Sequence, residues 1–276
     1  MKNPIEAIKQ RTSCRTYVAQ MLAPSDKEAI ESILKKYNIG LFGEEINFIL
    51  LEKDTECRQE MKITYGLISN HRSYILAKTK KDSNSRMSYG YLLEKIVLEA
   101  TAMQLGTCWI GVFDEAYFPE VDLSPEVSIP SLLFVGYAAQ KKKFVEKVAR
   151  FAVGASKRKD WDALFFKKDM NTALQPDQAG PYAESLNMLR LAPSAGNSQP
   201  WRVLMEDEGV FHFYRKTVSL KYQEIGLHDV DLGIALSHFE LTSVYNGLKG
   251  SWVQNPNVNP HNHDNMDYMI SWIAEK

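Results

Sequence analysis

Cysteine is scarce in this sequence, and its copies form no recognisable pair. Cys14, Cys57 and Cys108 are the only three, they lie far apart, and no C-x-x-C motif is present. An odd number of widely spaced cysteines argues against a disulfide framework and favours free thiols in a reducing compartment. We therefore expect a cytoplasmic protein. The segment at residues 1–11 lacks an apolar core, so we expect no secretory signal.

Long apolar runs and an excess of charge are also missing. No apolar stretch approaches the length of a membrane span. The formal net charge is −1, which disfavours a broad surface for nucleic acid or membrane but leaves a local basic pocket open. The glycine-rich phosphate motifs of P-loop and Rossmann proteins are absent as well. We predict neither a nucleic-acid nor a membrane partner.

The histidines offer little sign of a metal site. His261, His263 and Asp264 lie close together, but they belong to a loop rich in Asn and Pro with no distant partner implied. We predict that no metal binds there. No spacing of Ser, His and Asp suggests a nucleophilic triad either.

The apolar pattern predicts an α+β fold with antiparallel-type sheets packed on helices. With 276 residues, 45% of them hydrophobic, the chain can form one large domain or two small ones. Three- and four-residue spacing of apolar residues predicts helices, and short apolar runs predict strands. The expected helices span residues 4–11, 25–37, 57–67, 91–105, 184–191 and 231–245, and the expected strands span 46–51, 73–78, 131–137, 201–206 and 210–215.

The most distinctive stretch is Arg190–Val203, RLAPSAGNSQPWRV. Pro193 and Pro200 forbid a continuous helix. The small residues after Pro193 allow the backbone to approach a flat or anionic ligand closely. Asn197 and Gln199 bring amides that both donate and accept hydrogen bonds. Composition alone also allows a plain surface turn.

This stretch resembles the P-S-x-x-N-x-Q-P-W segment of the FMN-dependent nitroreductases. In that family the segment lies near the start of the chain and contacts FMN bound mainly by the other subunit. Here it lies two thirds of the way along. The resemblance implies that five residues contact FMN: Pro193, Ser194, Ala195, Asn197 and Gln199.

A second motif lies at the start of the chain. Arg11 and Arg15 are four residues apart with Ser13 between them. Two planar guanidinium forks and a hydroxyl suit a phosphate group, although a solvated basic turn has the same composition. The R-x-S-x-R pattern resembles the N-terminal FMN-phosphate motif of the nitroreductases. The resemblance implies that these three residues bind the phosphate.

Two further segments resemble parts of the same family. Residues 105–111, LGTCWIG, are similar to the segment whose backbone lies along the flavin ring, which implies contacts from Trp109, Ile110 and Gly111. Trp109 in an ordinary core is the alternative. The run at 131–137 resembles the late strand that precedes a basic phosphate ligand. Arg150 is the candidate, with Lys147 second, although a solvated helix end is the alternative.

The second half of the sequence repeats the order of the first. Each half has a long predicted helix, followed by a Gly and then by Trp109 or Trp252. Chance recurrence of helix and strand is the alternative. In the family's homodimer, R-x-S-x-R comes from one subunit and P-S-x-x-N from its partner, and here each half keeps one of the two. We expect a fused pseudo-dimer with halves at 1–160 and 161–276 and a single FMN. A monomer is expected, with further dimerisation open.

The resemblance also implies a reaction. Family members pass a hydride from NADH or NADPH to flavin N5 and then reduce a small nitroaromatic or quinone-like acceptor in a ping-pong cycle. No side-chain acid or base is required, because the chemistry belongs to the cofactor. Two alternatives stay open at this point: a flavin-binding protein without turnover, and an FMN-free interaction scaffold.

Overall fold

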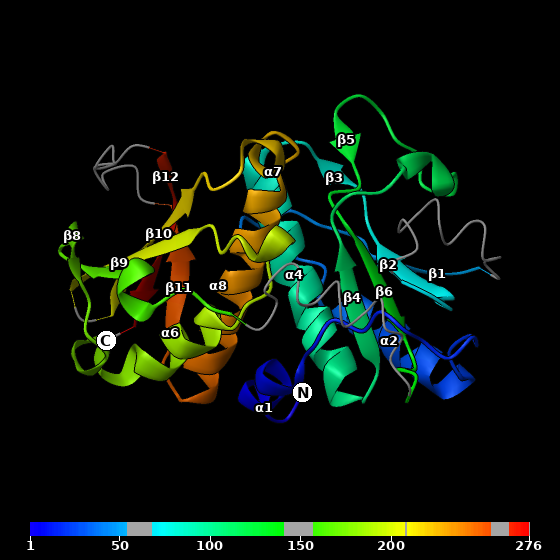
Figure 1. Cartoon of the computed structure of the whole chain (residues 1–276), viewed down its shortest axis with the longest axis horizontal. Helices are drawn as coiled ribbons and strands as arrows, with labels where there is room; N and C mark the ends of the chain where they lie inside the picture. Colours follow the sequence, from blue (N-terminus) through cyan, green and yellow to red (C-terminus); the bar gives the residue numbers. More distant parts are fainter. Residues whose placement is uncertain (54–67, 141–156, 208, 255–264, 276) are drawn as a thin grey trace.

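Two long helices lie side by side at the centre of the molecule, with a sheet on either side of the pair (Figure 1). They are α4 (Ser83–Ala102) and α8 (Leu227–Tyr245). The computed structural model describes residues 1–53, 68–140, 157–207, 209–254 and 265–275. The helix expected at 57–67 and the residues Lys147, Arg150, His261, His263 and Asp264 lie outside these ranges.

The first sheet has four strands, all antiparallel, in the order β1-β2-β6-β4. Their bounds are Ile49–Glu52 for β1, Ser73–Leu76 for β2, Gly106–Ile110 for β4 and Leu132–Gly136 for β6. The helices α1 (Pro4–Gln10) and α2 (Pro24–Lys36) precede it, and β3 (Thr79–Lys80) pairs with β5 (Val127–Ser128) beside it. The strands expected in this half are confirmed, with shifts of one to three residues at their ends.

The second sheet has six strands in the order β11-β12-β10-β9-β7-β8. Its strands are β7 (Phe165–Lys167), β8 (Asp169–Ala173), β9 (Trp201–Asp207), β10 (Val210–Lys216), β11 (Gly250–Val253) and β12 (Met266–Ala274). The pair β7–β9 is parallel, which departs from the antiparallel expectation. The other elements of this half are η2 (Trp161–Ala163), η3 (Pro176–Tyr182), α6 (Ala183–Arg190), η4 (Ala195–Asn197) and α7 (Leu220–Glu224), with η1 (Glu115–Tyr117) in the first half.

The stretch between the halves is more regular than the sequence suggested. Residues 157–169 and 176–181 were expected to form a link. Instead, this region contains β7, the first residue of β8 and most of η3. The link prediction was wrong here because Phe165 is fully buried against the second sheet, and its strand pairing outweighs the turn-forming residues around it.

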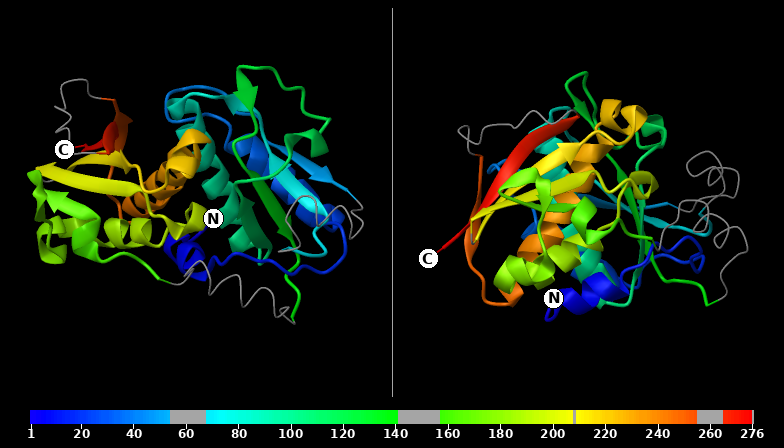
Figure 2. Two further views of the ribbon diagram at one scale, coloured as in Figure 1. Left: turned by 45° about the horizontal axis from the view of Figure 1, so that its top comes forward. Right: turned by 60° about the vertical axis from the view of Figure 1, so that its left-hand side comes forward.

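The two halves share one topology. Apart from the short strands β3 and β5, both contain strand, strand, long helix, strand and strand in that order, as β1-β2-α4-β4-β6 and β9-β10-α8-β11-β12. These four strands have the same order in each sheet, and β7 and β8 extend the second sheet. Views from other directions keep the two sheets on opposite sides of the helix pair (Figure 2). The described chain therefore forms two tandem halves related by a repeated arrangement.

The helix pair makes the closest contact between the halves. A Cβ on Gly90 would lie 2.1 Å from the carbonyl oxygen of Val230, and one on Gly233 would lie 1.9 Å from that of Met87. Only glycine allows backbones to approach so closely. The two glycines are 143 positions apart, as are Met87 and Val230. The contact is therefore reciprocal, as expected for equivalent positions in two related halves.

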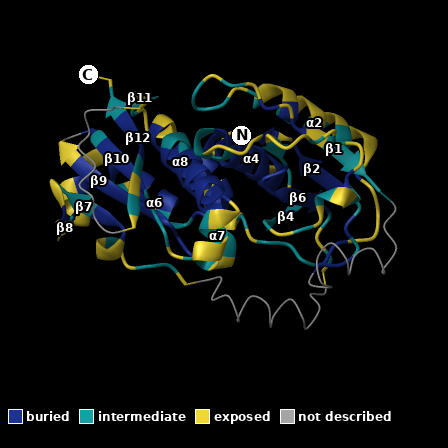
Figure 3. Ribbon diagram, turned by 90° about the horizontal axis from the view of Figure 1, so that it is seen from above, coloured by how far each residue is buried: buried dark blue, intermediate teal, exposed yellow. Residues whose placement is uncertain are grey.

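Helix α4 begins eight residues before the expected start at Tyr91. Asp82 caps it by accepting a hydrogen bond from the backbone N–H of Ser85 at 2.9 Å. The first two turns contain polar and small residues, yet Ser85, Ser88 and Gly90 are buried there, and Figure 3 shows α4 largely in the colour of buried residues. The expected stop at Gly106 is not observed either, because α4 already ends at Ala102. Gln104 takes the left-handed conformation with φ 65°, and Gly247 does so at the end of α8 with φ 79°.

One hydrophobic cluster joins both halves and contains buried residues of both central helices. Ile96 and Val97 of α4 and Leu232 and Leu236 of α8 are all fully buried in it. The helix pair is thus a shared core, and whatever lies at its ends is held by both halves. Within the described ranges, every helix is too short or too polar to cross a membrane.

Candidate functional site

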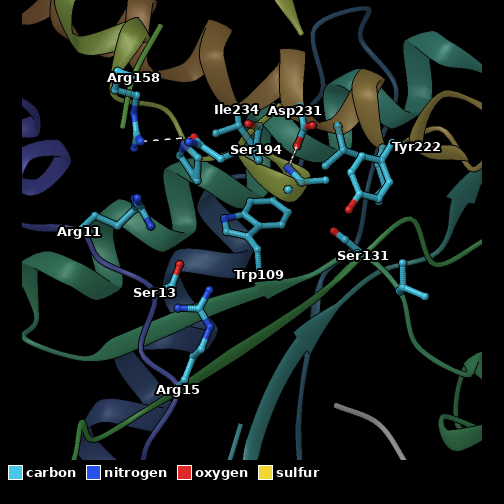
Figure 4. A pocket seen from close by; sticks show the side chains of 18 residues that line it. Arg11, Ser13, Arg15, Trp109, Ser131, Arg158, Ser194, Tyr222, Asp231 and Ile234 are labelled. Atoms are coloured by element: carbon cyan, nitrogen blue, oxygen red, sulfur yellow. Dashed lines mark hydrogen bonds between the residues drawn. The ribbon is translucent and has the colours of Figure 1, made fainter. Parts of the chain in front are cut away.

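A cavity of about 250 Å³ lies where the two halves meet. It is near the lower end of the size range of small-molecule sites. Residues from the N-terminal segment, β4, the loop after α6 and the start of α8 surround it (Figure 4). Its lining consists of Arg11, Ser13, Arg15, Trp109, Gly111, Val112, Ser131, Arg158, Pro193, Ser194, Ala195, Gly196, Asn197, Tyr222, Leu227, Val230, Asp231 and Ile234.

The N-terminal arginine motif reaches the cavity along β4. Helix α1 ends at Gln10, and the chain then runs beside the strand. Ser13 pairs with Thr107 in a parallel bridge, and the backbone N–H of Cys14 donates to the carbonyl of Thr107 at 2.8 Å. These contacts place R-x-S-x-R next to LGTCWIG, two motifs that are about ninety residues apart in sequence. Both motifs therefore contribute to one wall.

The arginine side of the cavity is strongly cationic. Nε of Arg11 and Nη1 of Arg15 are buried and have no hydrogen-bond partner. Burial, followed by repulsion from Arg11 and Arg190, lowers the pKa of Arg158. Buried donors that converge without a hydrogen-bonding acceptor favour an anionic ligand, because each unpaired charged donor is costly to keep from water. The donor set therefore fits a phosphate group.

The loop after α6 forms the opposite wall. Gly196, Asn197 and Gln199 all have positive φ, at 56°, 55° and 49°. The backbone N–H of Gln199 donates to Oγ of Ser194 at 2.9 Å, and the N–H of Ala195 donates to Oδ1 of Asp231 at 2.9 Å. A Cβ on Gly196 would lie 2.9 Å from the Tyr222 ring. Side chains on α7 and α8 thus fix a strained loop at the cavity.

Asp231 is an acidic residue in a cationic cavity, and burial changes its charge. Burial is the main cause that raises its pKa to about 8, and Asp229 adds to the rise, while hydrogen bonds from Ala195 and Ser198 oppose it. At neutral pH the folded protein therefore holds this carboxyl mostly protonated. A neutral Asp231 supports the loop without repelling an anion at the arginines.

Most of the residues expected from sequence meet at this cavity. Those that line it are Arg11, Ser13, Arg15, Trp109, Gly111, Pro193, Ser194, Ala195 and Asn197. Figure 4 shows Trp109 between the arginines and Tyr222. The amide of Asn197 is already engaged, since it accepts from Arg158 at 3.4 Å and donates to the carbonyl of Lys157 at 3.0 Å. Arg150 lies outside the described residues.

Two expected contacts do not line the cavity. The side chain of Ile110 packs into a separate hydrophobic cluster with Cys108 and Phe134, because side chains alternate across β4 and Trp109 takes the cavity face. Gln199 is 2% exposed, and its side chain accepts the backbone N–H of Lys159 at 2.8 Å. Ile110 thus offers no side chain to the cavity and Gln199 shapes the loop from behind, and their contacts with FMN stay predictions.

Several lining residues were not predicted from the sequence. Arg158 stands eight residues after the candidate Arg150, where the spacing is loose. Tyr222 and Asp231 come from α7 and α8, and their pattern reads as ordinary helix. Ser131 is 1% exposed and its Oγ has no hydrogen-bond partner. Asp231, an acidic residue near the start of a predicted apolar helix, was the one sequence feature that could have indicated a further lining residue. In the described part of the chain, no group of three His, Cys, Asp or Glu residues could hold a metal.

A comparison with family models identifies the chain's relatives. The model described as "Putative TM nitroreductase" matches residues 3–243. The chain belongs to this nitroreductase family. The fold, with its two tandem α+β halves, is the nitroreductase-like fold expected from the motifs.

One solved structure shares the fold over almost the whole chain, and a second is similar to part of it. A putative nitroreductase from Thermotoga maritima is 22% identical, with a TM-score of 0.62, and the match covers 98% of this chain and 93% of that one. A putative nitroreductase from Desulfovibrio desulfuricans in complex with FMN is 22% identical, with a TM-score of 0.42, and the match covers 53% of this chain and 96% of that one. No curated protein matches this chain.

Proposed function

We propose that the chain is an FMN-dependent NAD(P)H oxidoreductase of nitroreductase type. When bound, FMN would supply hydride and electron transfer between NADH or NADPH and a second small substrate. A nitroaromatic or quinone-like molecule is the proposed acceptor. No residue of the chain is proposed as an acid, base or nucleophile.

One observation carries the proposal. The arginine motif of the first half and the Pro193–Asn197 loop of the second half line a single cavity, although they are far apart in sequence. Nη1 of Arg15 is buried there without a hydrogen-bond partner, and Nε of Arg11 has no hydrogen bond either, with the Glu94 carboxylate 3.8 Å away. An FMN-free scaffold would gain nothing from such unpaired donors, so they favour a bound anion over that alternative.

The lining residues have distinct proposed roles. Arg11, Ser13 and Arg15 would hold the phosphate, with Arg158 as a fourth donor. Trp109 and Gly111 would border the ring system, and Ser194 with Asn197 would border its polar edge. Val112 and Leu227 make one part of the lining apolar, which suits a planar acceptor and excludes water. The chain thus binds, orients and shields, and the cofactor performs the redox step.

We further propose that the chain arose by fusion of two nitroreductase-like units, approximately residues 1–160 and 161–276. The shared topology and the equivalent helix glycines support this proposal. The fused chain would bind one FMN and act as a monomer in place of a homodimer.

The activity is tested by oxidation of NADH and NADPH by the FMN-loaded protein, with and without an added quinone or nitroaromatic. Acceptor-dependent oxidation that obeys ping-pong kinetics is expected. Tight FMN binding with no oxidation of either nucleotide by any acceptor would support a flavin-binding protein without turnover and contradict the proposal.

A further inference from the structure

Glu94 of α4 is a fully buried carboxylate directly behind the cavity. Its exposed fraction is 0%. Oε2 accepts the indole N–H of Trp109 at 2.9 Å, and Oε1 lies 3.8 Å from Nε of Arg11. Both partners line the cavity. A single carboxylate therefore contacts one residue of the arginine motif and one residue of the proposed flavin-face segment.

The same carboxylate also reaches the second half. Nε2 of His238, on α8, lies 2.9 Å from Oε1 of Glu94. Nδ1 of His238 lies 2.9 Å from the carbonyl oxygen of Met188, on α6. Because a carbonyl oxygen only accepts, Nδ1 carries a proton, which fixes the orientation of the ring. Helix α6 ends two residues after Met188 and leads into the Pro193–Asn197 loop.

A carboxylate in this position is unfavourable without partners. Burial of a charge is costly unless hydrogen bonds and opposite charges compensate it. Glu94 has both. Its direct partners come from the residue after α1, from β4 and from α8, and His238 connects it further to α6. An apolar side chain would pack against α8 equally well, but it could not hold Trp109 or Arg11 by a polar contact.

We infer that Glu94 is a positioning residue of the cavity. It orients the Trp109 indole and the Arg11 guanidinium, and through His238 it ties them to the segment that carries the Pro193–Asn197 loop. This inference rests on the proposed function only for the identity of the ligand. Glu94 itself does not line the cavity.

The chain contains a matched control. Glu240 of α8 accepts the indole N–H of Trp252 at 2.9 Å and lies 3.5 Å from Nζ of Lys95. It also accepts the hydroxyl of Tyr91. None of Trp252, Lys95 and Tyr91 lines the cavity. Glu240→Gln therefore makes the same chemical change at the same kind of Trp–carboxylate contact, away from the site.

The first experiment compares FMN affinity in the Glu94→Gln and Glu240→Gln proteins, by quenching of flavin fluorescence on titration of FMN with protein. Gln keeps the shape and one acceptor but removes the charge. We expect Glu94→Gln to weaken FMN binding about tenfold or more, since a charge-assisted contact to Arg11 is lost, and Glu240→Gln to change it less than about twofold. Equal affinities in the two variants would overturn the inference.

A second readout needs no flavin. Acrylamide quenching of Trp109, taken as the difference between each protein and its Trp109→Phe derivative, reports how firmly the indole is held. Glu94→Gln should increase this quenching and Glu240→Gln should not. If the parent protein binds no FMN, the proposed function fails, and this measurement still decides the role of Glu94. Unchanged quenching in Glu94→Gln would contradict it.

A third variant covers the case in which Glu94→Gln does not fold. In His238→Asn the side-chain amide can replace Nδ1 toward Met188, whereas the contact with Glu94 is lost. We expect FMN affinity to fall about threefold to tenfold, because the carboxylate keeps Trp109 and Arg11 but loses its link to α8. FMN affinity equal to that of the parent in a folded His238→Asn protein would contradict the proposed coupling between the halves.

Discussion

Trp109 and Trp252 occupy equivalent places in the two halves, 143 positions apart, yet their surroundings differ. Each follows its long helix and donates its indole N–H to a carboxylate of that helix, Glu94 or Glu240, at 2.9 Å. Trp109 lines a cavity beside buried arginine nitrogens that lack hydrogen-bond partners. Beside Trp252, Glu240 contacts Tyr91 and Lys95, which also contact each other.

The comparison shows that the same arrangement of helix, tryptophan and carboxylate can border a cavity beside Trp109 and, in the part of the chain that the structure describes, have no such cavity lining beside Trp252. Lys95 and His238 are also 143 positions apart, and each contacts the carboxylate on the opposite helix. Each tryptophan is therefore held in the same way, by a carboxylate of the long helix before it, and that carboxylate contacts a basic side chain of the other long helix. What distinguishes the first side is the arginine motif, which has no counterpart beside Trp252 among the described residues. The following predictions test this contrast.

The largest effect should follow removal of the arginines. Arg11→Ala combined with Arg15→Ala should weaken FMN binding about 100-fold or more, because each charge-assisted contact contributes about 1.5–3 kcal/mol. Isothermal titration with FMN would measure it. Lys9→Ala combined with Lys35→Ala removes two exposed charges and serves as the control. Full FMN affinity in the double-arginine variant would show that the phosphate binds elsewhere.

The contact between the helices should be equally sensitive from both sides. Gly90→Ala and Gly233→Ala would each place a Cβ against a backbone carbonyl, at 2.1 and 1.9 Å. Each should lower the free energy of unfolding by about 3 kcal/mol, the upper part of the usual cost of overpacking. Urea unfolding would measure this, with Lys35→Ala on exposed helix surface as the control. A cost at only one of the two glycines would argue against equivalent halves.

Asp231 should make stability depend on pH in a way that the matching position of the first half does not. Burial raises the pKa of Asp231 from 3.8 to about 8, so the folded protein keeps a proton that the unfolded chain releases between these values. Stability should fall as pH rises through this window, by about 1.4 kcal/mol per unit from this group. Asp231→Asn should remove that slope in urea unfolding at pH 5, 6 and 7.

The equivalent position in the first half provides the control for that experiment. Ser88, 143 positions before Asp231, accepts the backbone N–H of Leu41 at 3.0 Å, as Asp231 accepts that of Ala195. A hydroxyl does not titrate in this range, so Ser88→Ala should keep the slope of the parent protein. An unchanged slope in Asp231→Asn would mean that Asp231 is ionised in the folded state.

The smallest effect is expected on the side of Trp252. Lys95→Met removes a buried cation from Glu240 and should lower stability by about 1 kcal/mol, because Glu240 is partly exposed and keeps Tyr91 and Trp252. FMN affinity should change less than about twofold. A strong loss of FMN affinity would show that the second side takes part in cofactor binding.

Local chemistry explains what the sequence predicted. Arg11, Ser13 and Arg15 lie within five residues, and Pro193–Asn197 is continuous, so each motif could be recognised by itself. Tyr222, Asp231 and Arg158 could not, since they become lining residues only when α7, α8 and the segment before β7 pack around the loop.

Contacts between distant parts of the chain also explain why the predicted bounds of α4 differ from those in the structure. The spacing of apolar residues places the start of α4 too late, because Ser85, Ser88 and Gly90 look exposed in sequence but are buried in the fold, Gly90 against Val230 of α8 and Ser88 beside Leu41. The end was assigned to Gly106, but Gln104 makes the left-handed turn. A helix that packs on another through polar and small residues has no apolar stripe to reveal its first turns.

The central claim is that one composite FMN site forms between the two halves. Its most direct test is the number of FMN molecules bound per chain at saturation, from the visible spectrum and a protein assay. We expect one FMN per chain. Two per chain would mean that the region around Tyr91, Lys95 and Trp252 also binds flavin, and none after reconstitution with excess FMN would contradict the flavoprotein assignment altogether.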